Sequence, residues 1–168
     1  GTPIQNEEGK VIRITGTVQD VTERFQAEEA LRREEEKFRM LIENTVDWVW
    51  QVDVIGYYTY VSPQAKDLTG YSVDEILGKT PFDFMLPSEV ERMSPIFSKA
   101  AQSRERILGL EDTLLAKNGS EVVFETNATP LINSEGDFIG YMGTCRDITE
   151  NKKAEEALKE SHRKFANI

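Results

Sequence analysis

The feature that most constrains this chain is an internal repeat. Residues 2–38 match residues 129–165 at a constant offset of 127 without a gap, and 18 of the 37 pairs are identical. The identities include glycines as well as the run Ala-Glu-Glu-Ala-Leu, which begins at Ala27 and again at Ala154. Chance similarity between two glutamate-rich helices would explain that run, but not the glycines upstream of it. A repeat of this length indicates a tandem array whose unit is a whole domain with its linker.

The repeat predicts where the domains begin and end. We expect 1–23 to be the terminal strand and end of a preceding unit, 24–44 to be a linker helix, and 45–149 to be one complete domain. Residues 150–168 would then be an outgoing helix that leads to a further unit. Because the chain opens at Gly1 without a methionine, we expect it to be a segment of a larger protein.

Charge and cysteine content exclude several classes of function. The chain has 30 acidic and 20 basic residues, and its net charge of -10 repels nucleic-acid phosphates and anionic lipid. Its one cysteine, Cys145, cannot form an internal disulfide, and no apolar run approaches the roughly 20 residues that span a bilayer. We therefore expect a cytoplasmic domain with protein or small-molecule partners, and leave open whether its parent protein is anchored in a membrane.

Each copy of the repeat contains a predicted helix with an apolar seam at heptad spacing. Glu34 interrupts the seam in the first helix and Ser161 in the second. Such a stripe is either the face that a helix packs on its own domain or one side of a dimeric coiled coil, in which a polar seam residue sets the register. We favour the coiled coil, and hence a homodimer. The seam residues are Ala27, Leu31, Phe38, Leu41, Ala154, Leu158 and Phe165.

Between the two helices the sequence predicts strands and a broken helical region. Aromatic and β-branched residues, separated by glycine turns, indicate five strands. Glycines and prolines break 64–103 into three short turns and one longer helix, from Ser88 to about Arg104. Helices gathered between the second and third of five antiparallel strands predict an α+β domain, with the helices on one face of the sheet. The expected strands are 48–52, 57–61, 106–116, 121–132 and 137–146, with 11–19 as the strand of the first repeat copy.

The motifs from about Arg39 to Glu150 resemble those of a PAS domain from the tandem arrays of prokaryotic sensor histidine kinases. The resemblance implies the PAS fold, a five-stranded antiparallel sheet with short helices on one face and coiled-coil linker helices at both ends. It also implies a sensory and dimerisation module, whose pocket state shifts the flanking helices and so reaches neighbouring PAS units and a downstream output domain. The motifs are Asp53, Gly56 and Tyr60, Thr69-Gly70-Tyr71 with Asp74-Glu75 and Gly78, Lys117-Asn118-Gly119, and Asp147-Ile148-Thr149.

The closing Asp-x-Thr motif joins the last strand to the outgoing helix. Thr149 can cap that helix while Asp147 lies at the end of the strand, and Asp20 and Thr22 occupy the same positions in the first repeat copy. Because few bonds then connect strand and helix, a change in sheet geometry would tilt or rotate the helix. The motif also stabilises the start of the helix, and the resemblance adds a role in signal relay.

The sequence argues against two cofactors that PAS domains carry and leaves the cofactor unknown. A haem-binding member would present a His from the long helix or its neighbouring loop, but 80–110 contains none. A flavin photosensor of the covalent-adduct type would carry a reactive Cys in the helical segment, and 62–85 contains none. Cys145 aligns with Val18 in the repeat, which favours an inert core residue over a redox role. No paired Cys or His residues indicate a metal site.

No catalytic constellation is recognisable. The segment Ser161-His162-Arg163 resembles a histidine-kinase phosphoacceptor, but His162 aligns with Glu35 on the first linker helix. No nucleophile is arranged with a base, so we expect no catalysis from this segment, although its parent protein is expected to be a histidine kinase.

Aromatic and hydroxyl side chains of the hairpins and the long helix are the candidate pocket lining. Such a mixture is typical of binding cavities and equally of a filled core. Alternation places Trp48, Trp50 and Val52 on one face of the first strand, without telling which face meets the helices. The leading function is a sensory module for a small organic ligand, and the alternative is a spacer or protein-interaction module with a filled core. The candidates are Trp48, Trp50, Tyr60, Met93, Phe97, Ala100, Phe124, Thr126, Tyr141 and Thr144.

Overall fold

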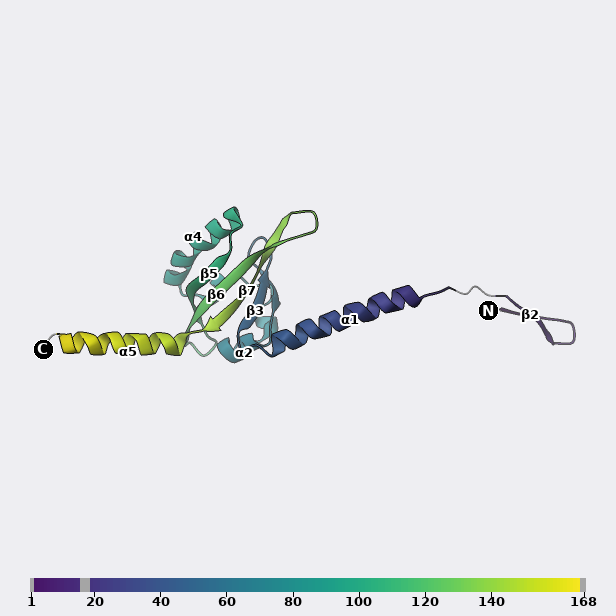
Figure 1. Cartoon of the computed structure of the whole chain (residues 1–168), viewed down its shortest axis with the longest axis horizontal. Coiled ribbons are helices and arrows are strands. Elements are labelled where there is room, and N and C mark those ends of the chain that lie inside the picture. The colour runs from purple at the N-terminus through teal and green to yellow at the C-terminus, as the bar shows by residue number, and fades with distance from the viewer. Residues whose placement is uncertain (1, 16–18, 167–168) are drawn as a thin grey trace. The chain divides into compact units, whose positions relative to one another are not determined.

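The computed structural model describes residues 2–15 and 19–166 and divides the chain into two units, Gly1–Met40 and Leu41–Ile168 (Figure 1). The first unit contains the larger part of a long helix, and a hairpin precedes that helix in the sequence. The second unit contains a five-stranded sheet, the helices associated with it and the outgoing helix.

The first unit begins with a strand that was not predicted. Strand β1 (Thr2–Gln5) pairs antiparallel with β2 (Val11–Thr15), and helix α1 (Thr22–Glu43) follows. The expected strand 11–19 is thus observed up to Thr15, while 16–18 lie outside the described residues. Helix α1 ends one residue before the predicted boundary at 44.

The second unit confirms the predicted α+β architecture. Its strands have the order β4-β3-β7-β6-β5, and every neighbouring pair is antiparallel. The observed strand ends agree with the predicted ones to within one residue, because alternation and turn residues mark them clearly. The strands are β3 (Trp48–Val52), β4 (Tyr58–Val61), β5 (Ile107–Leu115), β6 (Glu121–Ile132) and β7 (Phe138–Asp147).

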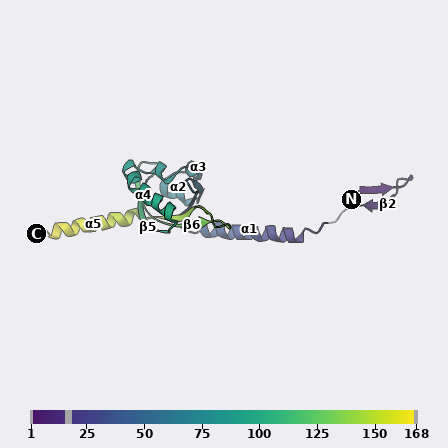
Figure 2. The same cartoon turned by 90° about the horizontal axis from the view of Figure 1, so that it is seen from above.

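The helical segment between β4 and β5 covers one face of this sheet. Figure 2 shows α2, α3 and α4 together on the same side of the sheet. Two of its short turns start with capping boxes, in which Ser72 pairs with Glu75 and Thr80 with Asp83. The helices are α2 (Gln64–Thr69), α3 (Val73–Ile76), the 3-10 turn η1 (Pro81–Phe84), α4 (Pro87–Ser103) and the outgoing α5 (Thr149–Ala166).

The core lies between the sheet and this helical cover. Trp48, Trp50 and Val52 are all buried, whereas the residues between them on β3 are half-buried. The inner face of the first strand, which alternation left open, is therefore the tryptophan face. The ring of Trp48 packs edge-on against Phe124 with centroids 5.9 Å apart, and Met93 of α4 is fully buried.

The hairpin of the first unit has the same backbone arrangement as the hairpin of β6 and β7. The pairs from Thr2↔Thr15 to Gln5↔Val11 recur in β6 and β7 at an offset of 127, and so does the register shift after the third pair. In both turns an asparagine side chain accepts the backbone N–H groups two and four residues further on, at 3.2 and 2.9 Å for Asn6 and at 2.9 and 2.9 Å for Asn133. The sequence repeat therefore has a structural counterpart in the described residues.

A test of the core concerns Gly140, which has a φ of +138° and lies against the backbone of β3. A Cβ at this position would collide with the carbonyl oxygen of Val52, so Gly140→Ala should lower the free energy of unfolding by about 3 kcal/mol or more. Urea denaturation followed by tryptophan fluorescence measures this change.

The matched control is Gly136→Ala. Gly136 has a φ of +89°, but a methyl group on its Cα would point into open space, so only the backbone cost of about 1 kcal/mol applies. Equal losses for the two variants would contradict the close packing of β7 on β3.

Candidate ligand pocket

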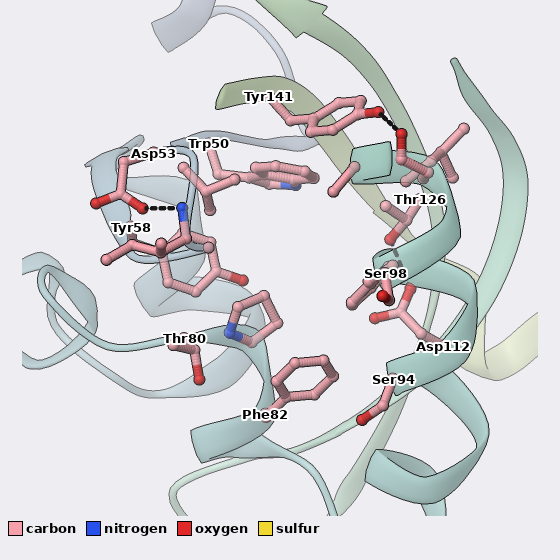
Figure 3. Close-up of a pocket in the computed structure, with 18 of the residues that line it drawn as sticks. Trp50, Asp53, Tyr58, Thr80, Phe82, Ser94, Ser98, Asp112, Thr126 and Tyr141 are labelled. Carbon is pink, nitrogen blue, oxygen red and sulfur yellow. Dashed lines mark hydrogen bonds between the residues drawn. The ribbon is translucent and has the colours of Figure 1, made fainter. Parts of the chain in front are cut away.

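A cavity of about 290 Å³ lies between the sheet and the helical cover (Figure 3). Strands β3, β4, β5, β6 and β7 all contribute to its wall, and η1 and α4 contribute from the opposite side. Most of the lining is apolar and much of it is aromatic. The aromatic lining residues are Trp50, Tyr58, Phe82, Phe97, Phe138 and Tyr141.

Five of the ten residues predicted for a pocket line this cavity and five do not. Trp48, Met93 and Phe124 are buried in the solid part of the core. Tyr60 and Thr144 are only half-buried and pair with Gln51 and Val49, which belong to the outer face of the sheet. The five that line the cavity are Trp50, Phe97, Ala100, Thr126 and Tyr141.

Sequence reasoning missed several lining residues, of which Asp112 is the most informative. On β5 the burial alternates, so that Asp112 and Leu114 face inward while Glu111 faces outward. Asp112 is only 4% exposed. The sequence did indicate this residue. An aspartate that alternates in step with the inward-facing apolar residues of a strand lies on the buried face, where a polar group is unusual.

Asp112 lies at the end of a chain of hydrogen bonds. The hydroxyl of Thr126 donates to Asp112 Oδ1 at 2.6 Å, and this uses the one proton of that hydroxyl. The Cys145 thiol, 3.2 Å from the same hydroxyl, must then donate to it, and Trp50 Nε1 donates to Cys145 Sγ at 3.1 Å. All three donors thus point along the chain toward the carboxylate, an arrangement in which neighbouring bonds strengthen one another.

Burial raises the pKa of the titratable groups in this chain. Desolvation raises the pKa of Asp112 to about 6, against the lowering effect of the Thr126 hydrogen bond. Desolvation likewise raises the pKa of the Cys145 thiol to about 12. The thiolate is the reactive form of cysteine, so such a thiol is a poor nucleophile at neutral pH.

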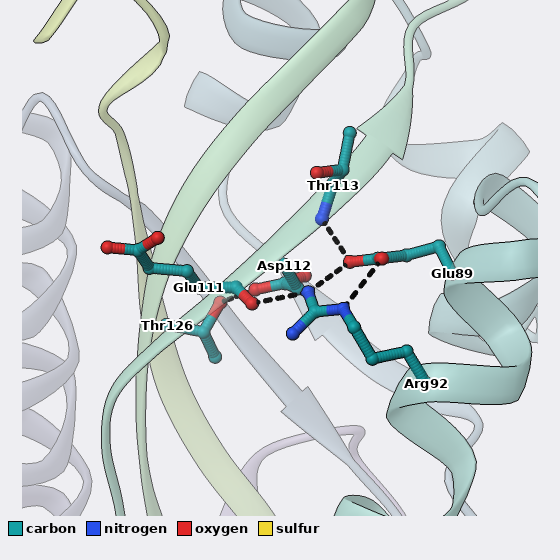
Figure 4. Close-up of polar contacts among 6 residues, drawn as sticks. All are labelled: Glu89, Arg92, Glu111, Asp112, Thr113 and Thr126. Atoms are coloured by element: carbon teal, nitrogen blue, oxygen red, sulfur yellow. Dashed lines mark hydrogen bonds and ion pairs between the residues drawn. The ribbon is translucent and has the colours of Figure 1, made fainter. Parts of the chain in front are cut away.

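An ion pair on α4 fastens this helix to β5 beside the cavity (Figure 4). Arg92 donates to both carboxylate oxygens of Glu89, at 2.9 and 2.6 Å, and to the backbone carbonyl of Glu111 at 2.7 Å. Glu89 in turn accepts the backbone N–H of Thr113 at 2.8 Å. The hydrogen bonds from Arg92 lower the pKa of Glu89. We call these four residues the α4–β5 clasp.

The junction between the sheet and α5 differs from the expected cap. Asp147 Oδ1, and not Thr149, accepts the first helical N–H, that of Thr149, at 2.8 Å. The Thr149 hydroxyl instead accepts the backbone N–H of Val123 on β6 at 3.0 Å, because the neighbouring strand lies within its reach. In the first repeat copy Asp20 accepts the N–H of Thr22 at 2.9 Å in the same way.

A second contact fixes α5 to the edge strand of the sheet. Lys152 Nζ lies 2.6 Å from Glu111 Oε1, on the outer face of β5. Glu111 directly precedes Asp112 in the chain, so neighbouring residues of one strand reach the helix and the cavity. This arrangement was not predicted, because it depends on where α5 leaves the sheet.

Comparison with known proteins identifies the fold family. The family model described as the PAS fold matches residues 42–153. The chain belongs to the PAS family. The PAS domain of a protein from Colwellia psychrerythraea superposes with a TM-score of 0.61 at 21% identity, over 72% of this chain and 98% of that one.

Curated relatives of this PAS domain belong to signalling proteins. The methyl sulfide methyltransferase-associated sensor of Methanosarcina acetivorans is 32% identical over 91% of this chain and 15% of its own length. Sporulation kinase C of Bacillus subtilis is 26% identical over 79% of this chain and 30% of its own length. The chain thus spans less than a third of these relatives.

Neither a metal site nor a membrane-spanning helix is found in the described part of this PAS domain. Within residues 2–15 and 19–166, no group of three or more His, Cys, Asp or Glu side chains could hold a metal ion. No helix in the same ranges is long and apolar enough to cross a bilayer.

The raised pKa of Asp112 generates a prediction on stability. The folded state binds this proton more tightly than the unfolded state does, so the contribution of Asp112 to stability is present below pH 4 and is lost as the pH rises toward 6. Asp112→Asn removes this loss. The variant should gain on the order of 2–3 kcal/mol relative to wild type between pH 4 and pH 7.5, measured by urea denaturation across that range.

The control variant is Asp83→Asn, on the cavity side of the domain. Hydrogen bonds from the backbone and hydroxyl of Thr80 lower the pKa of Asp83, so its contribution is present above pH 4 and is lost as the pH falls. Between pH 4 and pH 7.5 the difference between Asp83→Asn and wild type should therefore stay nearly constant, whereas the difference for Asp112→Asn should grow with pH. A flat difference for Asp112→Asn would contradict a buried carboxylate whose pKa is raised by desolvation.

Proposed function

We propose that this PAS domain is a sensory input and dimerisation module of a signal-transduction protein, most simply a cytoplasmic part of a histidine kinase. A small organic ligand in the cavity alters the sheet, and the outgoing helix α5 carries the change to an output domain. The domain itself catalyses nothing in this proposal. The observation that carries it is a cavity of about 290 Å³ whose wall strand β5 also holds α5.

The contacts around β5 support a route from the cavity to α5. Asp112 faces the cavity, while Glu111 beside it pairs with Lys152 of α5. The clasp adds a hydrogen bond from Arg92 to the backbone carbonyl of Glu111. A ligand that displaces α4 or β5 therefore pulls on the same peptide segment that holds α5.

The exposed seams of the helices support dimerisation. In the single chain Leu31, Phe38, Leu41 and Leu158 are at least half exposed. The alanines of the seams are exposed as well, whereas the side chain of Phe165 lies outside the described part of the structure. Large apolar side chains at heptad spacing are stabilised by a second helix, which a partner copy would supply.

The repeated hairpin supports a tandem array. On this proposal β1 and β2 correspond to the ends of β6 and β7 of a preceding PAS unit, and α1 is its outgoing helix. The hydrogen bond between Asp20 and Thr22 would then join strand and helix in that unit, as the hydrogen bond between Asp147 and Thr149 does here.

Ligand sensing is tested by filling the cavity. Ala101 of α4 lines it, so Ala101→Phe should occupy the space and abolish any thermal stabilisation by small molecules. The measurement is the shift of the melting temperature of wild type and variant across a library of metabolites, together with mass spectrometry of whatever the purified protein releases on denaturation.

The matched control is Lys99→Phe, an exposed position of α4 that does not line the cavity. It should leave stabilisation unchanged. A wild type that no compound stabilises and that releases nothing would reject ligand sensing, and would favour a spacer or protein-interaction module.

Dimerisation is tested at the seams. Leu31→Glu combined with Leu158→Glu places charges on both seams, so the double variant should dissociate at least tenfold more readily than wild type. Sedimentation equilibrium measures the dissociation constant. Arg32→Glu with Lys159→Glu, one position off the seams, should change it much less. A wild type that stays monomeric at high concentration would refute the coiled coil.

A further inference from the structure

The charges of the cavity wall are of one sign. Its lining includes two carboxylates, Asp53 and Asp112, and no Lys, Arg or His among the residues that the structure describes there. Asp53 Oδ1 already accepts the backbone N–H groups of Ile55 and Tyr57, at 3.0 and 2.9 Å. A ligand carboxylate or phosphate would meet repulsion here and find no cation to pair with.

Asp112 forms no ion pair or hydrogen bond with a cation in the described part of the protein. The charge of Arg92 lowers the pKa of Asp112 and that of Glu89 raises it, but Arg92 gives its hydrogen bonds to Glu89 and to the carbonyl of Glu111. From the other elements around it, Tyr58, Thr126 and Cys145 face Asp112, and none of them is a cation. Thr126 occupies one carboxylate oxygen, and Figure 3 shows the carboxylate beside Thr126 at the cavity wall. A buried carboxylate without a cation in direct contact is costly, and a cation supplied by a ligand would offset that cost.

The remaining wall suits the body of such a ligand. Six aromatic rings line the cavity, and the faces of aromatic rings attract organic cations. Phe138 already shows this property, since the guanidinium of Arg104 lies over its ring at 5.9 Å. An apolar cavity of about 150 Å³ holds one benzene molecule. A cavity of about 290 Å³ therefore has room for a body of two fused rings.

We propose that the ligand of this domain is an organic cation, with an ammonium or amidinium group that pairs with Asp112 and an aromatic body that packs among the six rings. This inference rests on the proposed ligand sensing and names the chemical class of the ligand. The buried carboxylate selects the charge, and the size of the cavity selects the ring system.

Three indoles with the same ring and different tails test the charge preference. They are tryptamine with an ammonium tail, tryptophol with a neutral hydroxyl tail, and indole-3-acetate with an anionic tail. Isothermal titration calorimetry at pH 7.5 should show wild type binding tryptamine roughly tenfold more tightly than tryptophol and indole-3-acetate least tightly of all. The preference for tryptamine should weaken at pH 5, where Asp112 takes up a proton while the ammonium stays charged.

Two variants locate the effect. Asp112→Asn should bind tryptamine and tryptophol equally well, whereas Asp53→Asn, which removes the other lining carboxylate and keeps an acceptor for its turn, should retain the preference. Circular dichroism checks that both variants are folded. Retention of the tryptamine preference in Asp112→Asn would overturn the assignment.

The outcomes also separate this inference from ligand sensing itself. If wild type binds tryptophol or indole-3-acetate as tightly as tryptamine, the cavity binds ligands but the organic-cation class is wrong. If none of the three indoles binds, the organic-cation inference is overturned, and the metabolite library then decides whether the cavity binds any ligand at all.

Discussion

The inner face of the sheet must be covered, and the helical segment between β4 and β5 covers it incompletely. Near Trp48 and Phe124 the cover is solid, with edge-on ring packing and a fully buried Met93. The second half of α4 instead faces the cavity, which Phe97, Ala100 and Ala101 line. Burying aromatic side chains stabilises a domain by about 2–3 kcal/mol each, so the solid half can hold the fold while the other half stays open to a ligand.

Leaving part of the core open to a ligand lowers the stability of the folded state, and Asp112 is an example. A carboxylate that is 4% exposed and receives one hydrogen bond destabilises the folded state at neutral pH. An apolar residue in its place would pack without that penalty. Residues that lower stability but provide a specific charge are typical of functional sites. Selection for binding tolerates a loss of stability that selection for stability alone would remove. The clasp does not remove this cost, because the charge of Glu89 raises the pKa of Asp112 while the charge of Arg92 lowers it.

Much of the fold was predictable from local sequence, and much of the site was not. Alternation and turn residues determine strand ends, so β3 and β6 were predicted to the residue. Strand β1 was missed although its repeat counterpart, 129–132, lies within a predicted strand, since only the offset connects the two. The cavity depends on where α4 lies. Contacts between residues far apart in the sequence determine that position, such as the hydrogen bond from Arg92 to the carbonyl of Glu111, which is 19 residues away. Trp48 and Trp50 share the inner face of β3. Only the helical segment that covers them decides that Trp50 lines the cavity and Trp48 does not.

The repeat separates what a tandem array would share from what it would vary. On the proposed array, Asp20 and Thr22 of the preceding unit are identical to Asp147 and Thr149 at the junction to the outgoing helix. The cavity residues of β7 all differ: Phe138, Tyr141 and Cys145 align with Val11, Ile14 and Val18. Valine or isoleucine provides no ring for a cation and no donor for the chain that ends at Asp112. The two units would therefore transmit through the same strand-to-helix junction while their pockets select different ligands.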